Sequence, residues 1–255
     1  MNRKFRMTDL LIKLLFTWNV LAPCLPLHAE WNPEEFLAMD SRPTNTLINR
    51  DFLTLKGRVM AALKSSWCSK EKINLLMDLV YFIRPEVCVE IGAFSGSSVL
   101  PVATILKLQN CGKIYAIDAW SNQEAVKYLA ENDPNRTWWA SVNMQEIRKI
   151  LDQMIHSWHL NGICLPIQGS SKNAVGLVPE IDFLHLDGDY SEVGSRSDVA
   201  LYFPKVKSGG YILLSNVAII VNDEQPKLES FYDLLNKCEL ICEVDNSNAI
   251  LFRKL

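Results

Sequence analysis

The chain has 255 residues, of which 49% are hydrophobic and 22% charged, as in an ordinary globular protein. This length suits one large domain, or one domain with a small extension. The formal net charge is -3, so the chain lacks the basic surplus that would bind a nucleic-acid backbone. The composition also excludes a disordered protein.

Residues 1–29 differ in pattern from the rest of the chain. Basic residues near the start precede an apolar stretch over residues 10–21, and a proline-containing segment then ends at Ala29. This order predicts a secretory signal peptide or a membrane anchor, and thus an exported or membrane-associated protein. Because Lys13 interrupts the apolar stretch, an amphipathic helix on the domain or on a membrane surface is the alternative, and the protein is cytoplasmic if the segment is no signal.

The next part of the chain divides into two regions. Residues 30–66 are mixed in character and are expected to form an N-terminal extension or linker with a short helix or two. Residues 67–255 are expected to form one domain, with a helical lid inserted around residues 121–160 and broken at Pro134.

Within this domain, apolar strands alternate with amphipathic helices. We expect strands over residues 87–91, 113–117, 164–167, 181–186, 211–214, 240–244 and 249–253, and helices over residues 69–83, 97–108, 198–206 and 228–236. The last two strands flank a polar turn and should form an antiparallel hairpin. The fold class is therefore α/β: a doubly wound, mostly parallel seven-stranded sheet with a C-terminal antiparallel hairpin.

Three expected strand ends carry residues suited to a ligand, as expected beyond the carboxyl ends of parallel strands. After the first strand the chain reads Glu90-Ile-Gly-Ala-Phe-Ser-Gly-Ser-Ser98, where glycines permit a tight turn and close backbone approach. The second strand ends at Asp118, a carboxylate that can accept two hydrogen bonds from ribose hydroxyls. The third is followed by Gln168-Gly-Ser-Ser171.

These motifs, together with the closing hairpin, resemble those of the class I S-adenosylmethionine-dependent methyltransferases. The resemblance spans residues 85–214 and is nearest to the branch of small-molecule and sugar O-methyltransferases, through Asp187-Gly-Asp189-Tyr-Ser191. It implies an enzyme that transfers a methyl group from S-adenosylmethionine to a small-molecule hydroxyl. The residues that it implies for cofactor binding are Glu90, Gly92, Ala93, Gly96, Ser97, Asp118, Ala119, Ser170 and Asp187.

Some of these residues carry a specific role in the family. The acid at Glu90 would hold the methionine amine, and the acid at Asp118 would hold the ribose. Ser170 stands where relatives have an aspartate near the adenine.

The resemblance also points to catalytic residues at the fourth strand. Asp187 matches an acid that binds a divalent cation in metal-dependent relatives, and Asp189 matches a base in some sugar methyltransferases. The remaining metal ligands of those relatives are an acidic residue and an asparagine, whereas this chain has Ser215 and Asn216. Because magnesium favours carboxylates, we expect no tightly bound metal, and Asp189 or His185 would serve as the base.

Several alternatives remain open at this stage. Asp187 and Asp189 would instead cap the following turn, and the lid tryptophans 138, 139 and 158 would either contact an acceptor or pack the lid. Arg136 would either hold an acidic substrate or be an ordinary exposed arginine, and Trp120 would either cover the adenine or line the core. Rival functions are a binding protein with this fold but no catalysis, and an NAD-dependent oxidoreductase, which the GxxxG spacing disfavours. The seven cysteines are expected to be free thiols, with a disulfide or metal pair at Cys238 and Cys242 as the alternative.

Overall fold

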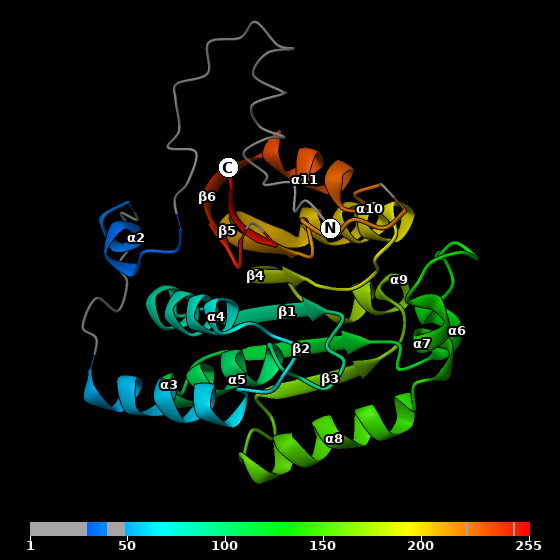
Figure 1. The fold of residues 1–255 in the computed structure, drawn as a ribbon. Helices are drawn as coiled ribbons and strands as arrows, with labels where there is room; N and C mark the ends of the chain where they lie inside the picture. Colours follow the sequence, from blue (N-terminus) through cyan, green and yellow to red (C-terminus); the bar gives the residue numbers. More distant parts are fainter. Residues whose placement is uncertain (1–29, 40–48, 223, 247) are drawn as a thin grey trace, which may run out of the picture.

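The computed structural model describes residues 30–39, 49–222, 224–246 and 248–255. Within them, seven strands form one sheet: β1 (Val87–Ile91), β2 (Lys113–Asp118), β3 (Cys164–Gln168), β4 (Ile181–Leu186), β5 (Val206–Ser215), β6 (Cys238–Val244) and β7 (Ala249–Lys254). Their order is β3-β2-β1-β4-β5-β7-β6 (Figure 1). The first five strands run parallel, and β7 is antiparallel to both of its neighbours. The predicted doubly wound sheet and closing hairpin are confirmed.

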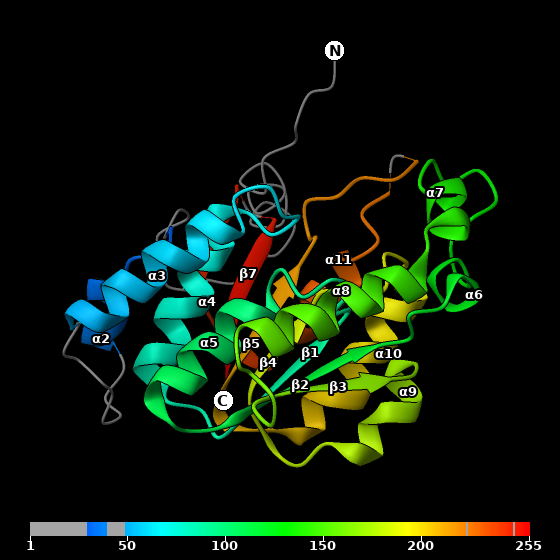
Figure 2. The ribbon, with the colours of Figure 1, turned by 90° about the horizontal axis from the view of Figure 1, so that it is seen from below.

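Helices cover both faces of this sheet (Figures 1 and 2). One buried cluster joins the sheet to α3 (Arg50–Ala62), α4 (Lys70–Ile83), α5 (Val99–Gln109) and α8 (Met144–Ser157). The other joins the opposite face to α10 (Glu192–Tyr202) and α11 (Leu228–Leu235), with α9 (Ser171–Ala174) beside them. The strands alternate between the clusters, since Cys88 packs in the first cluster and Val89 in the second.

The helix that directs the site is α4. Ser69 accepts a hydrogen bond from the Lys72 backbone N at 3.1 Å and so caps its start. The chain leaves the helix through Arg84, whose φ is 49°. Because α4 is almost wholly buried, its first turn is held against the strand ends.

One predicted helix was wrong in its bounds. The helix expected over residues 198–206 is α10, which begins at Glu192 because Ser191 accepts a hydrogen bond from Gly194 N at 3.0 Å. It ends at Tyr202, and a short 3-10 turn over Phe203–Lys205, which contains Pro204, follows it. Strand β5 then begins at Val206, earlier than expected, and contains Gly209 and Gly210.

The segment 121–160, expected to be a lid, divides into two parts. Helix α8 buries Leu151 and Ile155 against the sheet and belongs to the helical layer. Helices α6 (Asn122–Ala125) and α7 (Arg136–Ser141) stand together to one side of the sheet, beyond the end of β2 (Figure 2). The shorter portion is placed to cover a site.

Within residues 30–39 and 49–66, the parts of the N-terminal extension that the structure describes, there are two helices, α2 (Pro33–Met39) and α3. Trp31 Nε1 donates to Asp78 of α4 at 3.1 Å, and Lys56 of α3 pairs with the same carboxylate at 2.5 Å. The predicted signal or anchor in residues 1–29 lies outside the described residues. Nowhere in the described parts of the chain is a helix both long and apolar enough to span a membrane.

Candidate functional site

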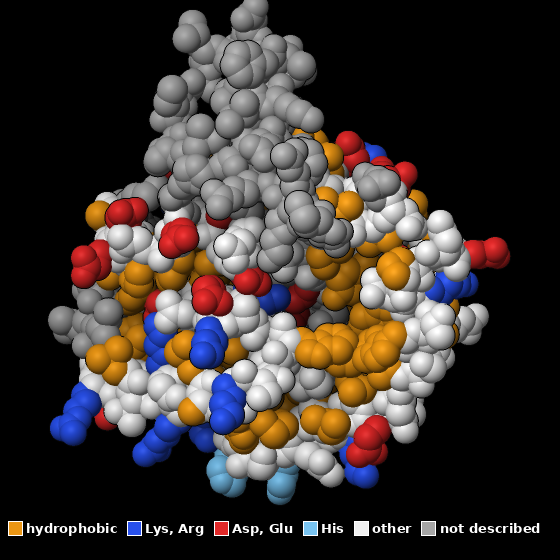
Figure 3. All heavy atoms as spheres, in the orientation of Figure 1, with side chains coloured by type: hydrophobic (Ala, Val, Ile, Leu, Met, Phe, Trp, Pro, Cys, Tyr) orange, Lys and Arg blue, Asp and Glu red, His pale blue; other side chains and the backbone are white. Residues whose placement is uncertain are grey.

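A cavity of about 690 Å³ lies at the carboxyl ends of β1, β2 and β4. Seven residues predicted to bind the cofactor line it: Gly92, Ala93, Ser97, Asp118, Ala119, Ser170 and Asp187. The space-filling view shows a hollow near the centre of this face with hydrophobic side chains gathered beside it (Figure 3). The site thus forms where open parallel sheets bind ligands.

Gly92 gives the cavity its floor. Its φ is 90°, and a Cβ atom there would lie 2.7 Å from the backbone O of Asp187 and from Gly188 Cα. Both of these atoms belong to the backbone, so no side chain can be accommodated at this position. Gly96 also has a positive φ, of 89°, but a Cβ there would meet Leu151 of α8. Gly96 therefore serves helix packing and does not line the cavity.

Asp118 is held rigidly at the end of β2. Its two carboxylate oxygens accept hydrogen bonds from the backbone N of Phe94 at 2.9 Å and of Trp120 at 2.7 Å. Burial raises the pKa of this carboxyl, and the two backbone N–H groups partly offset that effect. The result is a fixed acceptor facing the cavity beside the Gly92 turn.

Ser170 begins the short helix α9, where it accepts a hydrogen bond from Asn173 N at 3.4 Å. The residues of this turn, with Ala119, line the end of the cavity next to β2 and β3. Their small side chains leave the space open.

Glu90 differs from its expected role. Its side chain is completely buried and is absent from the cavity lining. It accepts a hydrogen bond from Ser98 Oγ, and its Oε2 lies 3.0 Å from Nδ1 of His185. That contact is not aligned as a hydrogen bond, and within the described residues neither atom has another hydrogen-bond partner. Glu90 therefore lies beneath the cavity lining and supports it. This position does not favour direct contact with a methionine amine.

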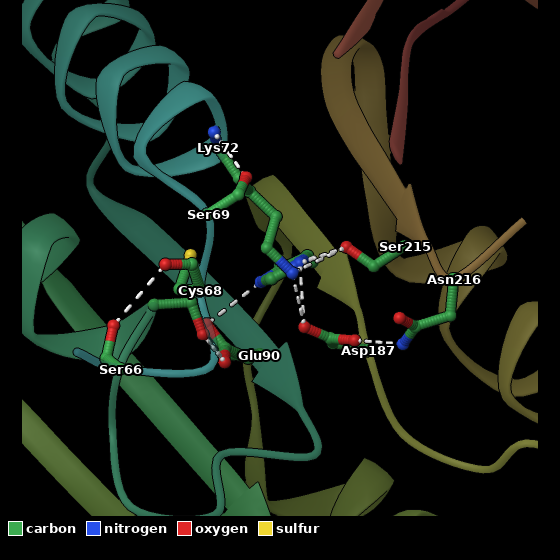
Figure 4. Close-up of polar contacts among 10 residues, drawn as sticks. Ser66, Cys68, Ser69, Lys72, Glu90, Asp187, Ser215 and Asn216 are labelled. Atoms are coloured by element: carbon green, nitrogen blue, oxygen red, sulfur yellow. Dashed lines mark hydrogen bonds and ion pairs between the residues drawn. The ribbon is translucent and has the colours of Figure 1, made fainter. Parts of the chain in front are cut away.

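A second polar cluster lies where β4 and β5 end, beside the start of α4 (Figure 4). Asp187 Oδ2 accepts a hydrogen bond from Lys72 Nζ at 2.8 Å, and its other oxygen accepts from Asn216 Nδ2. Lys72 Nζ also donates to Ser215 Oγ at 3.3 Å. Lys72, Asp187 and Asn216 all line the cavity.

The charges of this cluster stabilise one another. Burial opposes ionisation of Asp187, but the nearby charges of Lys72, His185 and Lys227 outweigh it and hold its pKa below the ordinary value. Burial likewise opposes protonation of Lys72, but Asp187 outweighs it and raises the lysine pKa. The pair is thus an ammonium and a carboxylate at neutral pH.

The two predicted bases lie in different surroundings. His185 is 1% exposed, lies behind the cavity lining, and places Nε2 2.8 Å from Ser215 Oγ. Because the ring is buried and lies outside the lining, its position does not favour the predicted role of a base in contact with an acceptor. Asp189 does line the cavity, but it accepts from Ser191 N at 2.7 Å and packs directly over Gly194. It therefore also caps the turn that precedes α10.

Aromatic rings form the rim of the cavity. Trp67 stacks on Phe94 with centroids 4.9 Å apart and lies 5.0 Å from Trp138. The ring of Trp139 belongs to the same group, and its centroid lies 5.9 Å from the ring centroid of Tyr190. Since Trp67 is 63% exposed, the group has an open apolar surface suited to a ring or another apolar acceptor.

The positions of Arg136 and Trp120 favour structural roles. Arg136 donates to the backbone O of Val126 and of Leu129, so it fastens the loop after α6 and is not aimed at a substrate. Trp120 is 1% exposed and donates its Nε1 to Phe94 O at 3.0 Å. It is a core residue and does not line the cavity. Six cysteines in the described residues are free, as predicted.

Sequence reasoning missed Lys72 and Trp67. A signal for Lys72 exists, since it lies in helical phase with Leu76 and Leu79, both fully buried. A lysine on the apolar face of a helix indicates a buried charge that needs a partner. No comparable signal exists for Trp67, because its neighbours in space come from distant segments.

The oxygen set at β4 and β5 does not suit a resident magnesium ion. Asp187 is its one carboxylate, Ser215 and Asn216 are neutral, and Lys72 Nζ already contacts two of the three. Magnesium is ordinarily held by carboxylates, and an ammonium at the same oxygens repels it. The described residues also contain no cluster of three or more His, Cys, Asp or Glu side chains able to hold a metal. By contrast, the open backbone turn at Gly92, here called the Gly92 cradle, and the carboxylate of Asp118 suit S-adenosylmethionine.

Comparisons with known proteins agree with this geometry. A family model described as a methyltransferase domain matches residues 89–217, more than half of the chain. A search of curated proteins found no match.

Among solved structures, the chain resembles an O-methyltransferase from Bacillus cereus in complex with SAH, with 16% identity, a TM-score of 0.52, and coverage of 82% of this chain and 94% of the other. It also resembles the O-methyltransferase TomG from Streptomyces achromogenes in complex with SAM (11% identity, TM-score 0.53, coverage 88% and 96%). A third similar structure is the SAH-bound methyltransferase PaMTH1 from Podospora anserina (13% identity, TM-score 0.52, coverage of 92% of this chain and 100% of the other).

These identities are low, so the structural matches show a shared fold, whereas the family model shows membership. The rival prediction of an NAD-dependent oxidoreductase is thereby excluded. The chain belongs to the methyltransferase domain family, with the fold of the class I S-adenosylmethionine-dependent methyltransferases.

Proposed function

We propose that this chain transfers a methyl group from S-adenosylmethionine to a hydroxyl group of a small molecule. The observation that carries the proposal is the pairing of the Gly92 cradle with the Asp118 carboxylate at one end of the cavity. The solved structures of similar fold include O-methyltransferases, which supports oxygen as the acceptor atom.

The cofactor would be held mainly by residues of fixed geometry. Asp118 would accept hydrogen bonds from the ribose hydroxyls, because its carboxylate is already oriented by two backbone N–H groups. The turn from Gly92 to Ala93 would allow the methionine portion close to the backbone, and the turn at Ser170 would contact the adenine. When bound, S-adenosylmethionine supplies a methyl carbon activated by a positively charged sulfur.

The chain must then bring an acceptor oxygen into line with that carbon, since positioning provides much of the rate for such a displacement. The cavity extends from the Asp118 end past Gly92 to Asp187 and Asn216. The aromatic rim formed by Trp67, Phe94, Trp139 and Tyr190 would hold the apolar part of the acceptor. Asp189 lines the same wall and remains a candidate for receiving the hydroxyl proton.

Titration calorimetry of the full chain with S-adenosylmethionine and S-adenosylhomocysteine tests cofactor binding. We expect saturable binding of both, and weaker binding by Asp118→Asn. Methyl transfer is then measured with radiolabelled cofactor and a panel of small hydroxyl compounds. A folded chain that binds neither ligand would refute the proposal.

A binding protein that retains the cofactor site without catalysis is the second candidate. It would bind S-adenosylhomocysteine normally and transfer no methyl group to any acceptor in the panel. Export or membrane attachment through residues 1–29 also remains a prediction, which N-terminal sequencing of the mature chain from its native cells would test.

A further inference from the structure

The acceptor end of the cavity contains a permanent cation. Lys72 reaches from the first turn of α4 to the ends of two strands, and its Nζ lies within hydrogen-bond distance of Asp187 and Ser215 (Figure 4). Its side chain is only 8% exposed. Because Asp187 and Asn216 line the cavity beside it, the ammonium lies at the wall where an acceptor would lie.

This ammonium has capacity for a ligand. A lysine ammonium carries three N–H donors, and within the described parts of the chain two of them have partners, Asp187 Oδ2 and Ser215 Oγ. Asp187 is itself held by Asn216, and Ser215 is held by His185 Nε2 at 2.8 Å. The lysine is thus fixed in place from both sides, with one donor remaining for an atom in the cavity.

We propose that Lys72 is a catalytic residue that binds the acceptor oxygen and stabilises its negative charge, in the place where a metal-dependent methyltransferase would use a divalent cation. The inference rests on the proposed function. As the acceptor oxygen forms its bond to the methyl carbon, the carbon–sulfur bond breaks and its electron pair stays on sulfur. A protonated Lys72 cannot accept the hydroxyl proton, so that proton passes to Asp189, which lines the same cavity, and from there to solvent.

The position of the Lys72–Asp187 pair in the cavity wall distinguishes it from a structural ion pair. The Lys56–Asp78 pair joins α3 to α4 at 2.5 Å, and neither residue lines the cavity. Lys72 and Asp187, by contrast, both line it, and the rim aromatics Trp67 and Tyr190 line it with them. A largely buried, preorganised cation at this position would act on charge that develops during the reaction.

The test uses 4-nitrophenol, a chromogenic phenol whose ionised form absorbs visible light. It is titrated against pH in the presence of the full chain saturated with S-adenosylhomocysteine. An ammonium in contact with the phenol oxygen should lower the apparent pKa of the bound phenol by about 1 to 3. Lys72→Met should abolish this decrease, Lys72→Arg should retain part of it, and Lys56→Met, the matched control, should leave it intact.

Lys72→Met leaves Asp187 unpaired in a buried site and can fail to fold. The double variant Lys72→Met, Asp187→Asn removes both charges and keeps the test decisive. It should bind S-adenosylhomocysteine and still show no decrease in the apparent pKa of the phenol. A decrease that persists in this folded double variant would overturn the proposal.

The wild-type protein provides the remaining outcomes. If it binds S-adenosylhomocysteine but shows no saturable phenol binding, or no decrease in apparent pKa, the role of Lys72 is refuted while the proposed function stands. If it does not bind S-adenosylhomocysteine, the proposed function itself fails. Methyl transfer to the phenol should be unaffected by a chelator, and a loss that magnesium alone restores would also overturn the proposal.

Discussion

The two ends of the cavity are built in different ways. The cofactor end is made of short turns at the ends of β1, β2 and β3, where backbone groups of these turns position Gly92 and Asp118. The acceptor end is assembled from α4, β4 and β5, and the contacts of Lys72 there cross 115 and 143 residues of sequence. A shared cofactor can be bound by a local motif, whereas acceptor chemistry depends on side chains brought together by the fold.

The largest effect is expected at Gly92, where local backbone geometry is strictest. Gly92→Ala should lower the free energy of unfolding by about 2–4 kcal/mol and abolish cofactor binding, because its Cβ would collide with backbone at 2.7 Å. Gly57→Ala is the control, since nothing lies within 4 Å of its Cβ and it lies in helix α3. It should stabilise the chain by about 0.5–1 kcal/mol. Equal effects in denaturant unfolding would contradict the importance of the Gly92 turn.

Asp198 of α10, which also lines the cavity, gives the next largest effect. Burial raises the pKa of this carboxyl to about 6, above its ordinary value of about 4. The folded chain therefore binds the proton more tightly than the unfolded chain, and stability should fall as pH rises from about 4 to 6 and then level off.

Asp198→Asn should remove this loss, which is at most about 3 kcal/mol. The gain over wild type should be present at pH 7.5 and nearly absent at pH 4 in denaturant unfolding. A gain of the same size at both pH values would show that the carboxyl is not the cause.

Asp118→Asn is expected to have a more moderate effect, confined to the cofactor end. The amide can still accept one hydrogen bond, but the charge-assisted bonds to the ribose would be lost. Affinity for S-adenosylhomocysteine should fall by about 10-fold, or about 1.4 kcal/mol. Calorimetry measures this loss, and the absorbance titration of 4-nitrophenol should show little change in the apparent pKa of the bound phenol. A large change in that pKa would mean that the two ends are not separable.

The smallest effect is expected at the rim. Trp67→Ala should cost about 1 kcal/mol or less in stability, because its ring is already 63% exposed. Binding of aromatic acceptors should weaken several-fold through loss of the Phe94 stack, while cofactor affinity stays unchanged. Leu177→Ala, at a similarly exposed residue outside the cavity lining, is the control for surface truncation. Weaker cofactor binding would place Trp67 at the other end of the site.

Much of the fold was predictable because it depends on neighbouring residues. Apolar runs specified each strand, and polar turn residues specified the closing hairpin. The start of α10 was missed because its capping serine follows the Asp187-Gly-Asp189 motif, which drew a functional interpretation instead.

The sequence by itself determined the sheet, the Gly92 turn and the carboxylate at the end of β2, because periodicity and turn chemistry act over a few residues. Only the tertiary structure decided that Glu90 and His185 face each other inside the core, and that Lys72 meets Asp187 and Ser215. The physical reason is that a buried charge is stable only with a partner, and the partner's place in the sequence is set by the packing of α4 against the strand ends.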